Sequence, residues 1–228
     1  MKKLIKVYVI GAGSYGSSYT RFLTNFEYTG EIEKADVVIL TGGADVDPSF
    51  YGADRHPTTY SHISRDKEEL EEIKKVRQDQ LVVGICRGSQ FSCVLNGGLL
   101  VQNVNNHAIG MGHGIVATKA AKRYNSIDQE MYEITSTHHQ MQYPFTIPSS
   151  EYDILFTSFP NRSDIYQGDK IDPTPIIKIG EPEIVLYHRK ECPRFLAIQG
   201  HPEMIPESAV SKMIENLIYE LLEENENV

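Results

Sequence analysis

The sequence lacks tryptophan, has only three cysteines, and has fewer basic than acidic side chains. So few cysteines, in an odd number, argue against a disulfide framework and favour a reducing compartment, so we expect a cytoplasmic protein. Lys and Arg total 22 against 31 Asp and Glu, which gives a formal net charge of −9 and disfavours nucleic acid or an anionic membrane as a partner. The sequence also lacks an apolar run near the roughly 18 residues that a membrane-spanning helix needs.

What the sequence does contain is an alternation of short apolar runs and amphipathic segments, typical of a parallel sheet covered by helices. We therefore predict one α/β domain over residues 1–228, with three layers and a mainly parallel central sheet. The expected helices are 66–76, capped by Ser64 or Asp66, a segment directly after Cys86, and a C-terminal helix with an apolar stripe over 210–222. The expected strands are 6–10, 37–40, 81–85, 152–157, 184–187 and 195–198.

A cysteine flanked by glycines follows the expected strand 81–85, in the segment Gly84-Ile85-Cys86-Arg87-Gly88. This pattern predicts a sharp strand-to-helix turn with Cys86 at its tip, the thiol counterpart of a nucleophile elbow. A helix N-terminus favours the thiolate, whereas an ordinary thiol with a pKa near 8.5 is only about 3% ionised at pH 7. Cys86 is therefore a candidate nucleophile, and a small buried core residue is the alternative.

The segment His201-Pro202-Glu203 supplies the base that a thiol nucleophile needs. It comes just after the expected strand 195–198, so the imidazole would lie at the same edge of the sheet as Cys86. His201 would take and return the proton, and Glu203, turned back by Pro202, would accept the second imidazole N–H. A His-x-Glu segment alone is common. Its position after a core strand is what makes His201 a candidate base and Glu203 a candidate partner for it.

A glycine pair, Gly42-Gly43, directly follows the expected strand 37–40. Its backbone N–H groups can point into the crevice at the carboxyl ends of the strands, so the N–H of Gly43 and that of Arg87 would form an oxyanion hole. A plain turn is the alternative, with Asp45 and Asp47 as turn formers. These two carboxylates have no further ligand at a fitting spacing, so we predict neither a metal nor a cofactor.

Together, Cys86-x-Gly88-x-Gln90 and the later His-Pro-Glu segment resemble the class I glutamine amidotransferases and their Cys-His-Glu triad. Longer motifs, in order from about residue 36 to residue 203, are similar to the γ-glutamyl-γ-aminobutyrate hydrolase branch, peptidase C26. These motifs are Gly42-Gly43-Ala44-Asp45-Val46-Asp47-Pro48, Tyr51-Gly52, Arg65-Asp66, the segment 84–90, Asn96-Gly97-Gly98 with Leu100 and Gln102, and Ser136-Thr137-His138-His139-Gln140.

The resemblance implies a class I glutamine amidotransferase-like fold of flavodoxin-like topology. It also implies thiol-dependent hydrolysis of a γ-glutamyl amide through a glutamyl thioester on Cys86, with His201 and Glu203 completing the triad. Two versions of that activity stay open: a stand-alone hydrolase of a small γ-glutamyl substrate, and a glutaminase subunit that passes ammonia to a synthetase or ligase partner. A homo-oligomer is compatible with both. The implied substrate-binding residues are Gly42, Gln90, His138, His139 and Gln140, although the two histidines could be ordinary loop residues.

Two features depart from the pattern of that branch. Gly200 stands where an aromatic residue usually precedes the His-Pro-Glu segment, so we expect room or flexibility beside the base. The segment between the first strand and the Gly-Gly loop is short, so we expect one strand–helix unit to be reduced. The remaining cysteines are expected to be a core residue, Cys93, and a surface thiol, Cys192.

A competing motif, Gly11-x-Gly13-x-x-Gly16, follows the first strand and matches the dinucleotide-binding fingerprint. Asp36 lies twenty residues beyond Gly16, but it precedes the expected strand 37–40 instead of ending it, as the ribose-binding acidic residue would. A dinucleotide-binding protein is therefore a remote alternative. A flexible glycine turn beside the glutamyl pocket is the preferred interpretation.

Overall fold

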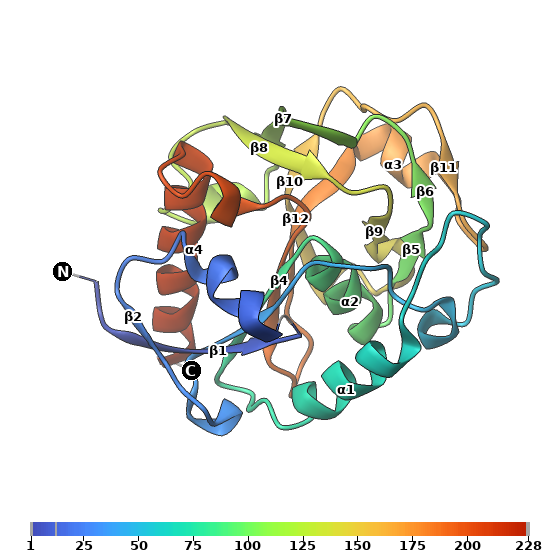
Figure 1. Cartoon of the computed structure of the whole chain (residues 1–228). Coiled ribbons are helices and arrows are strands. Elements are labelled where there is room, and N and C mark those ends of the chain that lie inside the picture. The colour runs from blue at the N-terminus through green and yellow to red at the C-terminus, as the bar shows by residue number, and fades with distance from the viewer. Residues whose placement is uncertain (1, 12, 227–228) are drawn as a thin grey trace.

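A large mixed sheet organises the molecule in the computed structural model, which describes residues 2–11 and 13–226 (Figure 1). Within the described residues its order is β2-β1-β3-β4-β13-β12-β10-β7-β8. Its strands are β1 (Ile5–Ile10), β2 (Phe26–Tyr28), β3 (Val37–Leu40), β4 (Leu81–Ile85), β7 (Ala108–Ala117), β8 (Met131–Thr137), β10 (Tyr152–Ser158), β12 (Glu181–Tyr187) and β13 (Arg194–Ile198). Two small sheets pair β5 (Leu99–Val101) with β9 (Met141–Tyr143) and β6 (Asn103–Val104) with β11 (Tyr166–Gln167).

The strands from β2 to β13 run parallel, and those from β12 to β8 continue the sheet in antiparallel pairing. The α/β prediction is confirmed, and β3 and β4 have the predicted bounds. Because β1, β3, β4 and β13 are parallel, their carboxyl ends meet at one edge of the sheet. The antiparallel strands β7 and β8 were not predicted, since the glycine-rich sequence of β7 lacks a run of β-branched residues.

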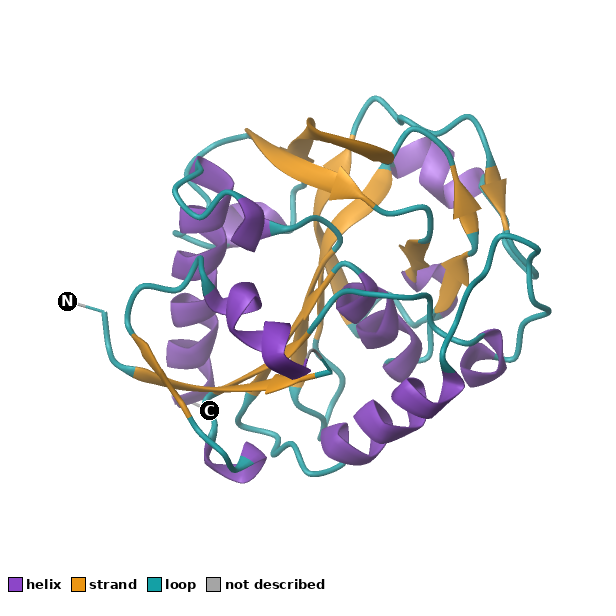
Figure 2. Ribbon diagram, viewed as in Figure 1, coloured by secondary structure: helices purple, strands orange, loops and turns teal. Residues whose placement is uncertain are grey.

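Helices cover both faces of the sheet, which gives the predicted three layers (Figure 2). Side chains alternate along β3: Val37 and Ile39 share a core cluster with Leu217 of α4, and Val38 and Leu40 share another with Phe91 of α2. The α-helices are α1 (Ile63–Ile73), α2 (Arg87–Leu95), α3 (Thr174–Ile179) and α4 (Ala209–Glu226). None of the helices within residues 2–11 and 13–226 is both long enough and apolar enough to cross a bilayer.

The predicted start of α1 is wrong. The helix begins at Ile63, and its N-cap, His62, makes no side-chain capping hydrogen bond. Asp66 is 1% exposed and forms an ion pair with Arg87, so its carboxylate is committed to a tertiary contact instead of to a helix end. Ser64 lies inside the first turn and likewise does not cap the helix.

The connection from β1 to β3 is reduced, as expected, to the 3-10 turns η1 (Gly13–Thr20) and η2 (Ile32–Lys34) around the short strand β2. This geometry argues against a dinucleotide site. A 3-10 turn follows Gly11, and the Asp36 carboxylate accepts a hydrogen bond from Lys6 N at 2.7 Å, at the opposite end of the strands. Ala12, within the glycine motif, lies outside the described residues.

Candidate active site

Cys86 lies at the tip of a sharp turn between β4 and α2. Its backbone has φ 53° and ψ −109°, a left-handed conformation that side chains rarely adopt and that is typical of a nucleophile elbow. The turn is fixed because Cys86 N donates to Ile198 O at 2.8 Å while Cys86 O accepts from Ser89 N at 3.0 Å. A Cβ at Gly88 would lie 2.1 Å from Leu40 O, so only glycine lets α2 approach β3 this closely.

His201 and Glu203 follow β13, which pairs in parallel with β4 and places Ile198 opposite Ile85. The 3-10 turn η6 (Pro202–Met204) brings the Glu203 carboxylate back, so that His201 Nδ1 lies 2.7 Å from Glu203 Oε1. A Cβ at Gly42 would lie 3.5 Å from both Cys86 Cβ and His201 Cε1. The sulfur and the imidazole therefore flank the same glycine, as the sequence predicted.

The protonation of His201 follows from its surroundings. Burial alone would lower the pKa of His201, but its hydrogen bonds to Cys86 and Glu203, together with their charges, raise it to about 10. At neutral pH the imidazole therefore holds its proton beside the sulfur. An imidazolium next to a cysteine is the arrangement that favours a thiolate nucleophile.

The other two cysteines have different environments. Cys93 is fully buried, and burial raises the pKa of its thiol to about 12, which confirms the predicted core role. Cys192 is partly exposed in the loop before β13. A high pKa suppresses thiolate formation, so Cys93 is unsuited to nucleophilic chemistry.

The sequence analysis did not anticipate a buried charge network behind the elbow. The Arg87 guanidinium is 1% exposed and forms ion pairs with Asp66 and Glu69 of α1. Asp66 also accepts a hydrogen bond from Asp47 N at 2.8 Å, so α1, the elbow and the loop after β3 are tied together. The Arg65-Asp66 motif was the signal that could have revealed this network.

Arg65 extends the network to the proposed oxyanion hole. It lies 2.7 Å from Glu69 and donates to Gly42 O at 3.0 Å, so the Gly42–Gly43 peptide is held in place. Arg87 is the first residue of α2, where the backbone N–H has no acceptor within the helix. Gly43 lines the pocket beside Cys86. The backbone N–H groups of Gly43 and Arg87 are therefore the proposed donors of the oxyanion hole.

A pocket of about 190 Å³ opens beside Cys86, lined among others by Gly43, Asp45, Gln90 and residues 137–140. It brings together the proposed binding residues except Gly42, which lies behind Cys86. Gln90 Nε2 donates to Gln140 O at 2.9 Å, so this amide holds the loop after β8. His139 Nε2 lies 3.0 Å from Asp45 Oδ1, which joins the two loops that border the pocket.

Asp45 and Asp47 act locally as turn residues. Asp47 is the N-cap of η3 (Pro48–Tyr51), and its carboxylate accepts hydrogen bonds from the backbone and hydroxyl of Ser49. Asp45 accepts from Tyr60 N at 2.7 Å in addition to its contact with His139. Protein donors therefore engage both carboxylates.

Tyr19 is a site residue that the sequence analysis missed. Its hydroxyl would lie 2.9 Å from a Cβ at Gly42, directly beside Cys86 and His201. Burial raises the pKa of this phenol, and the charges of Glu203 and Cys86 raise it further. Tyr19 lies in η1, the turn that also contains Gly13 and Gly16, so the expectation that this glycine turn borders the pocket was the available signal.

Gly200 does not leave room beside the base, as the sequence had suggested. A Cβ at this position would lie 2.5 Å from Thr135 O and 2.5 Å from Ile134 Cγ1, because β8 packs directly against it. The Thr135 hydroxyl also forms two hydrogen bonds with the backbone of His201. It accepts from His201 N at 2.9 Å and donates to His201 O at 3.0 Å. The small residue therefore permits a tight contact that fixes the imidazole.

Comparison with solved structures identifies the fold. A glutamine amidotransferase from Thermotoga maritima superposes with a TM-score of 0.54 over 98% of this chain and 96% of that one, at 14% identity. The glutaminase domain of Trypanosoma brucei CTPS, with bound acivicin, superposes with a TM-score of 0.55 over 94% and 93%, at 10% identity. The protein thus has the class I glutamine amidotransferase fold.

Sequence relatives match about half of the chain. The Lactococcus lactis protein named "Putative glutamine amidotransferase-like protein YvdE" is 33% identical in an alignment 119 residues long, which covers 46% of this chain and 50% of that protein. The Mycobacterium tuberculosis protein named "Putative glutamine amidotransferase Rv2859c" is 31% identical in an alignment 120 residues long, which covers 48% of this chain and 39% of that protein. The matches thus span half or less of these two relatives. The Peptidase C26 family model matches residues 23–144, more than half of the chain, and the protein belongs to the peptidase C26 family.

Proposed function

We propose that this protein hydrolyses a γ-glutamyl amide bond through a glutamyl thioester on Cys86. The observation that carries the proposal is the convergence of a strained cysteine elbow with an imidazole that a carboxylate orients at 2.7 Å, beside a small polar pocket. The same elements are expected of thiol-dependent acyl transfer in general, because a thiolate, a proton carrier and amide donors are its minimum requirements. Membership of the C26 family, together with the resemblance of the motifs to γ-glutamyl hydrolases, supports a γ-glutamyl acyl group.

In the proposed first step, the Cys86 sulfur attacks the δ-carbonyl carbon of the substrate. The N–H groups of Gly43 and Arg87 stabilise the oxyanion, and His201 gives its proton to the departing amine as the C–N bond breaks. In the second step, His201 takes a proton from water, which attacks the thioester. The carbon–sulfur bond then breaks, which releases the γ-carboxylic acid and restores the thiolate–imidazolium pair, and the acid loses its proton to solvent.

A second candidate is a glutaminase subunit that delivers ammonia to a synthetase. The observation that favours it is the fold likeness to the CTPS glutaminase domain, which its name describes as one domain of CTPS. Both candidates use the same thioester chemistry. Ammonia release from glutamine by the purified chain alone would support the hydrolase, and release only after addition of a second protein would support the subunit.

The proposal is tested by trapping the acyl-enzyme with glutamine or a γ-glutamyl amine and identifying the modified peptide by mass spectrometry. We expect a glutamyl adduct on the peptide that contains Cys86. Cys93→Ala and Cys192→Ala serve as matched controls and should still form the adduct at near-normal rates, since neither sulfur lies beside an imidazole–carboxylate pair. An adduct on either of those residues, or none with any γ-glutamyl amide, would contradict the proposal.

Glu203→Gln is expected to move the alkaline limb of the pH–rate profile to lower pH. The Glu203 carboxylate is one of the groups that raise the pKa of His201 to about 10, and the neutral amide removes that attraction. A raised pKa keeps the imidazolium present below about pH 10 and loses it above, so the variant loses its proton donor at lower pH. At neutral pH we expect kcat to fall by about 10²-fold or more, because the imidazole also loses its orienting acceptor.

The measurement is steady-state hydrolysis from about pH 6 to about pH 11, the range that contains both limbs. Glu207→Gln is the matched control, because Glu207 is exposed and pairs only at the surface with Lys212 among the described residues. An unchanged alkaline limb in Glu203→Gln would show that Glu203 does not tune the base.

A further inference from the structure

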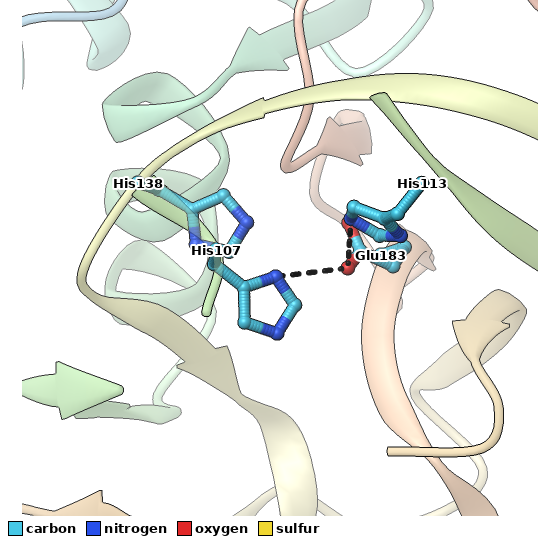
Figure 3. Close-up of side chains that lie close together, drawn as sticks. All are labelled: His107, His113, His138 and Glu183. Carbon is cyan, nitrogen blue, oxygen red and sulfur yellow. Dashed lines mark ion pairs between the residues drawn. The ribbon is translucent and has the colours of Figure 1, made fainter. Parts of the chain in front are cut away.

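A second cluster of ionisable side chains joins segments of the antiparallel half of the sheet (Figure 3). It consists of His107 just before β7, His113 within β7, His138 just after β8, and Glu183 on β12. All four side chains are buried, none more than 3% exposed, and one ligand atom from each lies within 4.8 Å of the others. His138 also lines the pocket as a proposed substrate-binding residue, and the proposed hydrolysis assigns no step to the other three.

The imidazoles of His113 and His138 are each held by a hydrogen bond from the ring nitrogen that does not take part in the cluster. His113 Nδ1 donates to Gly114 O at 3.1 Å, and His138 Nδ1 donates to Gln140 O at 2.9 Å. A nitrogen that donates to a carbonyl carries the proton, so the Nε2 atoms of both neutral rings present lone pairs. Burial lowers the pKa of His138 well below its usual range, which keeps that ring neutral.

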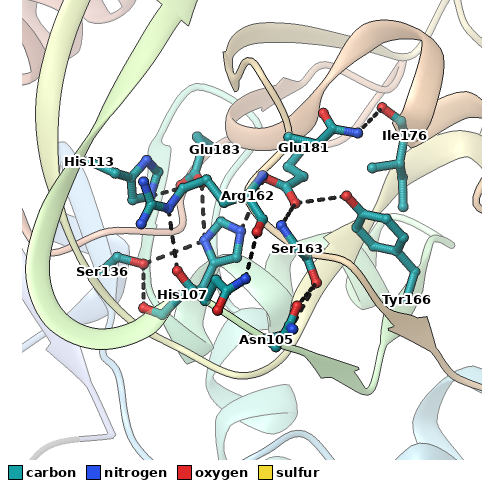
Figure 4. Close-up of polar contacts among 12 residues, drawn as sticks. Asn105, His107, His113, Ser136, Arg162, Ser163, Tyr166, Ile176, Glu181 and Glu183 are labelled. Carbon is teal, nitrogen blue, oxygen red and sulfur yellow. Dashed lines mark hydrogen bonds and ion pairs between the residues drawn. The ribbon is translucent and has the colours of Figure 1, made fainter.

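His107 is oriented by a carboxylate (Figure 4). Its Nε2 lies 3.1 Å from Glu181 Oε2, and its Nδ1 lies 3.7 Å from Glu183 Oε1. Glu181 is itself fixed, because it accepts hydrogen bonds from Arg162 N, Ser163 N and Tyr166 Oη at 2.8–2.9 Å. Imidazoles that ligate metals are generally held in this way, with the outer N–H on a carboxylate or a backbone carbonyl.

The Glu183 carboxylate, at the centre of the cluster, has too few hydrogen-bond donors around it among the described residues. Glu183 is 1% exposed, and neither of its oxygens makes a well-formed hydrogen bond with any residue in the described part of the chain. Its Oε1 faces His113 Nε2 at 3.2 Å, so two acceptors point at one another. A buried carboxylate in this position is costly unless a metal ion or a proton lies between the acceptors.

We propose that His107, His113, His138 and Glu183 bind one divalent transition-metal ion, with Zn²⁺ as the preferred ion. Three imidazole nitrogens and one carboxylate oxygen form a four-ligand set that suits tetrahedral zinc. Bonds of about 2.0 Å in a tetrahedron place the ligand atoms about 3.3 Å apart. The observed separations of 3.2 and 3.7 Å around Glu183 Oε1 are close to that value, and small side-chain movements bring in the more distant atoms.

The ion has a structural role because the four ligands fill its coordination shell. It ties β7 and β12 to the turn after β8, which carries His138 and Gln140. Both of these residues line the pocket beside Cys86. Metal binding therefore stabilises one wall of the pocket from behind, and it does so whether or not the protein acts on γ-glutamyl amides.

The competing explanation is a proton. Burial lowers the pKa of His113, but the nearby Glu183 carboxylate raises it overall, so an imidazolium could neutralise the carboxylate. A proton and a metal ion differ in what they require of the other two imidazoles. The metal needs His107 and His138 as ligands, whereas the His113–Glu183 pair alone would hold the proton.

The test uses the full chain without a histidine tag, stripped of metal with a chelator and titrated with Co²⁺. We expect one equivalent to bind with the intense visible absorption of a tetrahedral site, to be displaced by Zn²⁺, and to show no thiolate charge-transfer band. Zn²⁺ at about a hundredfold excess over Kd should raise Tm by about 5 °C or more. Cys86→Ala should give the same spectrum, which excludes the Cys86–His201 pair as the binding site.

Glu183→Gln and His138→Gln should each weaken Co²⁺ binding by about a hundredfold or more, because each substitution removes one of the four ligands. His188→Gln is the matched control, because His188 pairs with Asp153 outside the cluster and should leave binding unchanged. Failure of the unaltered chain to bind Co²⁺ or Zn²⁺ would overturn the proposal even if a variant did not fold. Undiminished binding by folded Glu183→Gln or His138→Gln, or a spectrum that disappears in Cys86→Ala, would also overturn it.

Discussion

Cys86→Ala should reduce hydrolysis of γ-glutamyl amides by about 10⁵-fold or more, because removal of a covalent nucleophile removes the acyl-enzyme route. The fold should persist. Alanine has the same Cβ as cysteine, so the strain at φ 53° is unchanged, and the lost sulfur borders the pocket as well as a core cluster. The measurement combines amine release with circular dichroism and thermal unfolding of the same preparation.

Cys93→Ala is the control that separates a lost nucleophile from a lost sulfur. It empties a small volume behind α2, where Cys93 Sγ contacts Leu99 O at 3.4 Å, so it should cost some stability while activity stays near normal. If Cys86→Ala turned over substrate at the normal rate, or if only Cys93→Ala were inactive, the assignment of the nucleophile would be wrong.

Arg87→Met should destabilise the protein by about 3–5 kcal/mol, because breaking a buried ion pair leaves its partners as uncompensated buried charges. The partners are Asp66 and Glu69, which are 1% and 2% exposed. For a chain of this size that loss corresponds to a fall in Tm of roughly 10 °C. Urea unfolding monitored by circular dichroism measures it. Activity should fall as well, because Asp66 also holds Asp47 N in the loop after β3.

Lys74→Met is the matched control, since Lys74 and Glu71 form an exposed pair on the same helix region, and such pairs contribute about 1 kcal/mol or less. Arg87→Lys separates charge from geometry: it keeps the charge but loses the planar fork that reaches two carboxylates at once, so stability should be intermediate. Equal effects of Arg87→Met and Lys74→Met would mean that the buried network contributes no more than a surface pair.

The parallel half of the fold could be predicted because its sequence signals are local. The strands β3 and β4 are buried on both faces, so they appear as continuous apolar runs with clear ends. Each proposed catalytic residue lies shortly after the end of such a run, and parallel strands bring their carboxyl ends together. The positions of Cys86, His201 and Glu203 therefore followed from motif and topology.

What the sequence missed depends on contacts between distant segments. The acidic start of α1 suggested a cap at Asp66, but a buried arginine far along the chain determines the role of that carboxylate. Gly200 suggested space, but β8, which lacks a strong strand pattern, fills it. The cluster of three histidines and Glu183 joins β7, β8 and β12, and no spacing within one segment reveals such a site.

β13 joins the two halves of the large sheet, because it pairs in parallel with β4 and antiparallel with β12. Cys86 follows β4 and His201 follows β13, so the pairing of these two strands is what brings the sulfur and the imidazole together. A chain that ended before β13 would therefore lack both the strand that connects the two halves and the imidazole beside the sulfur.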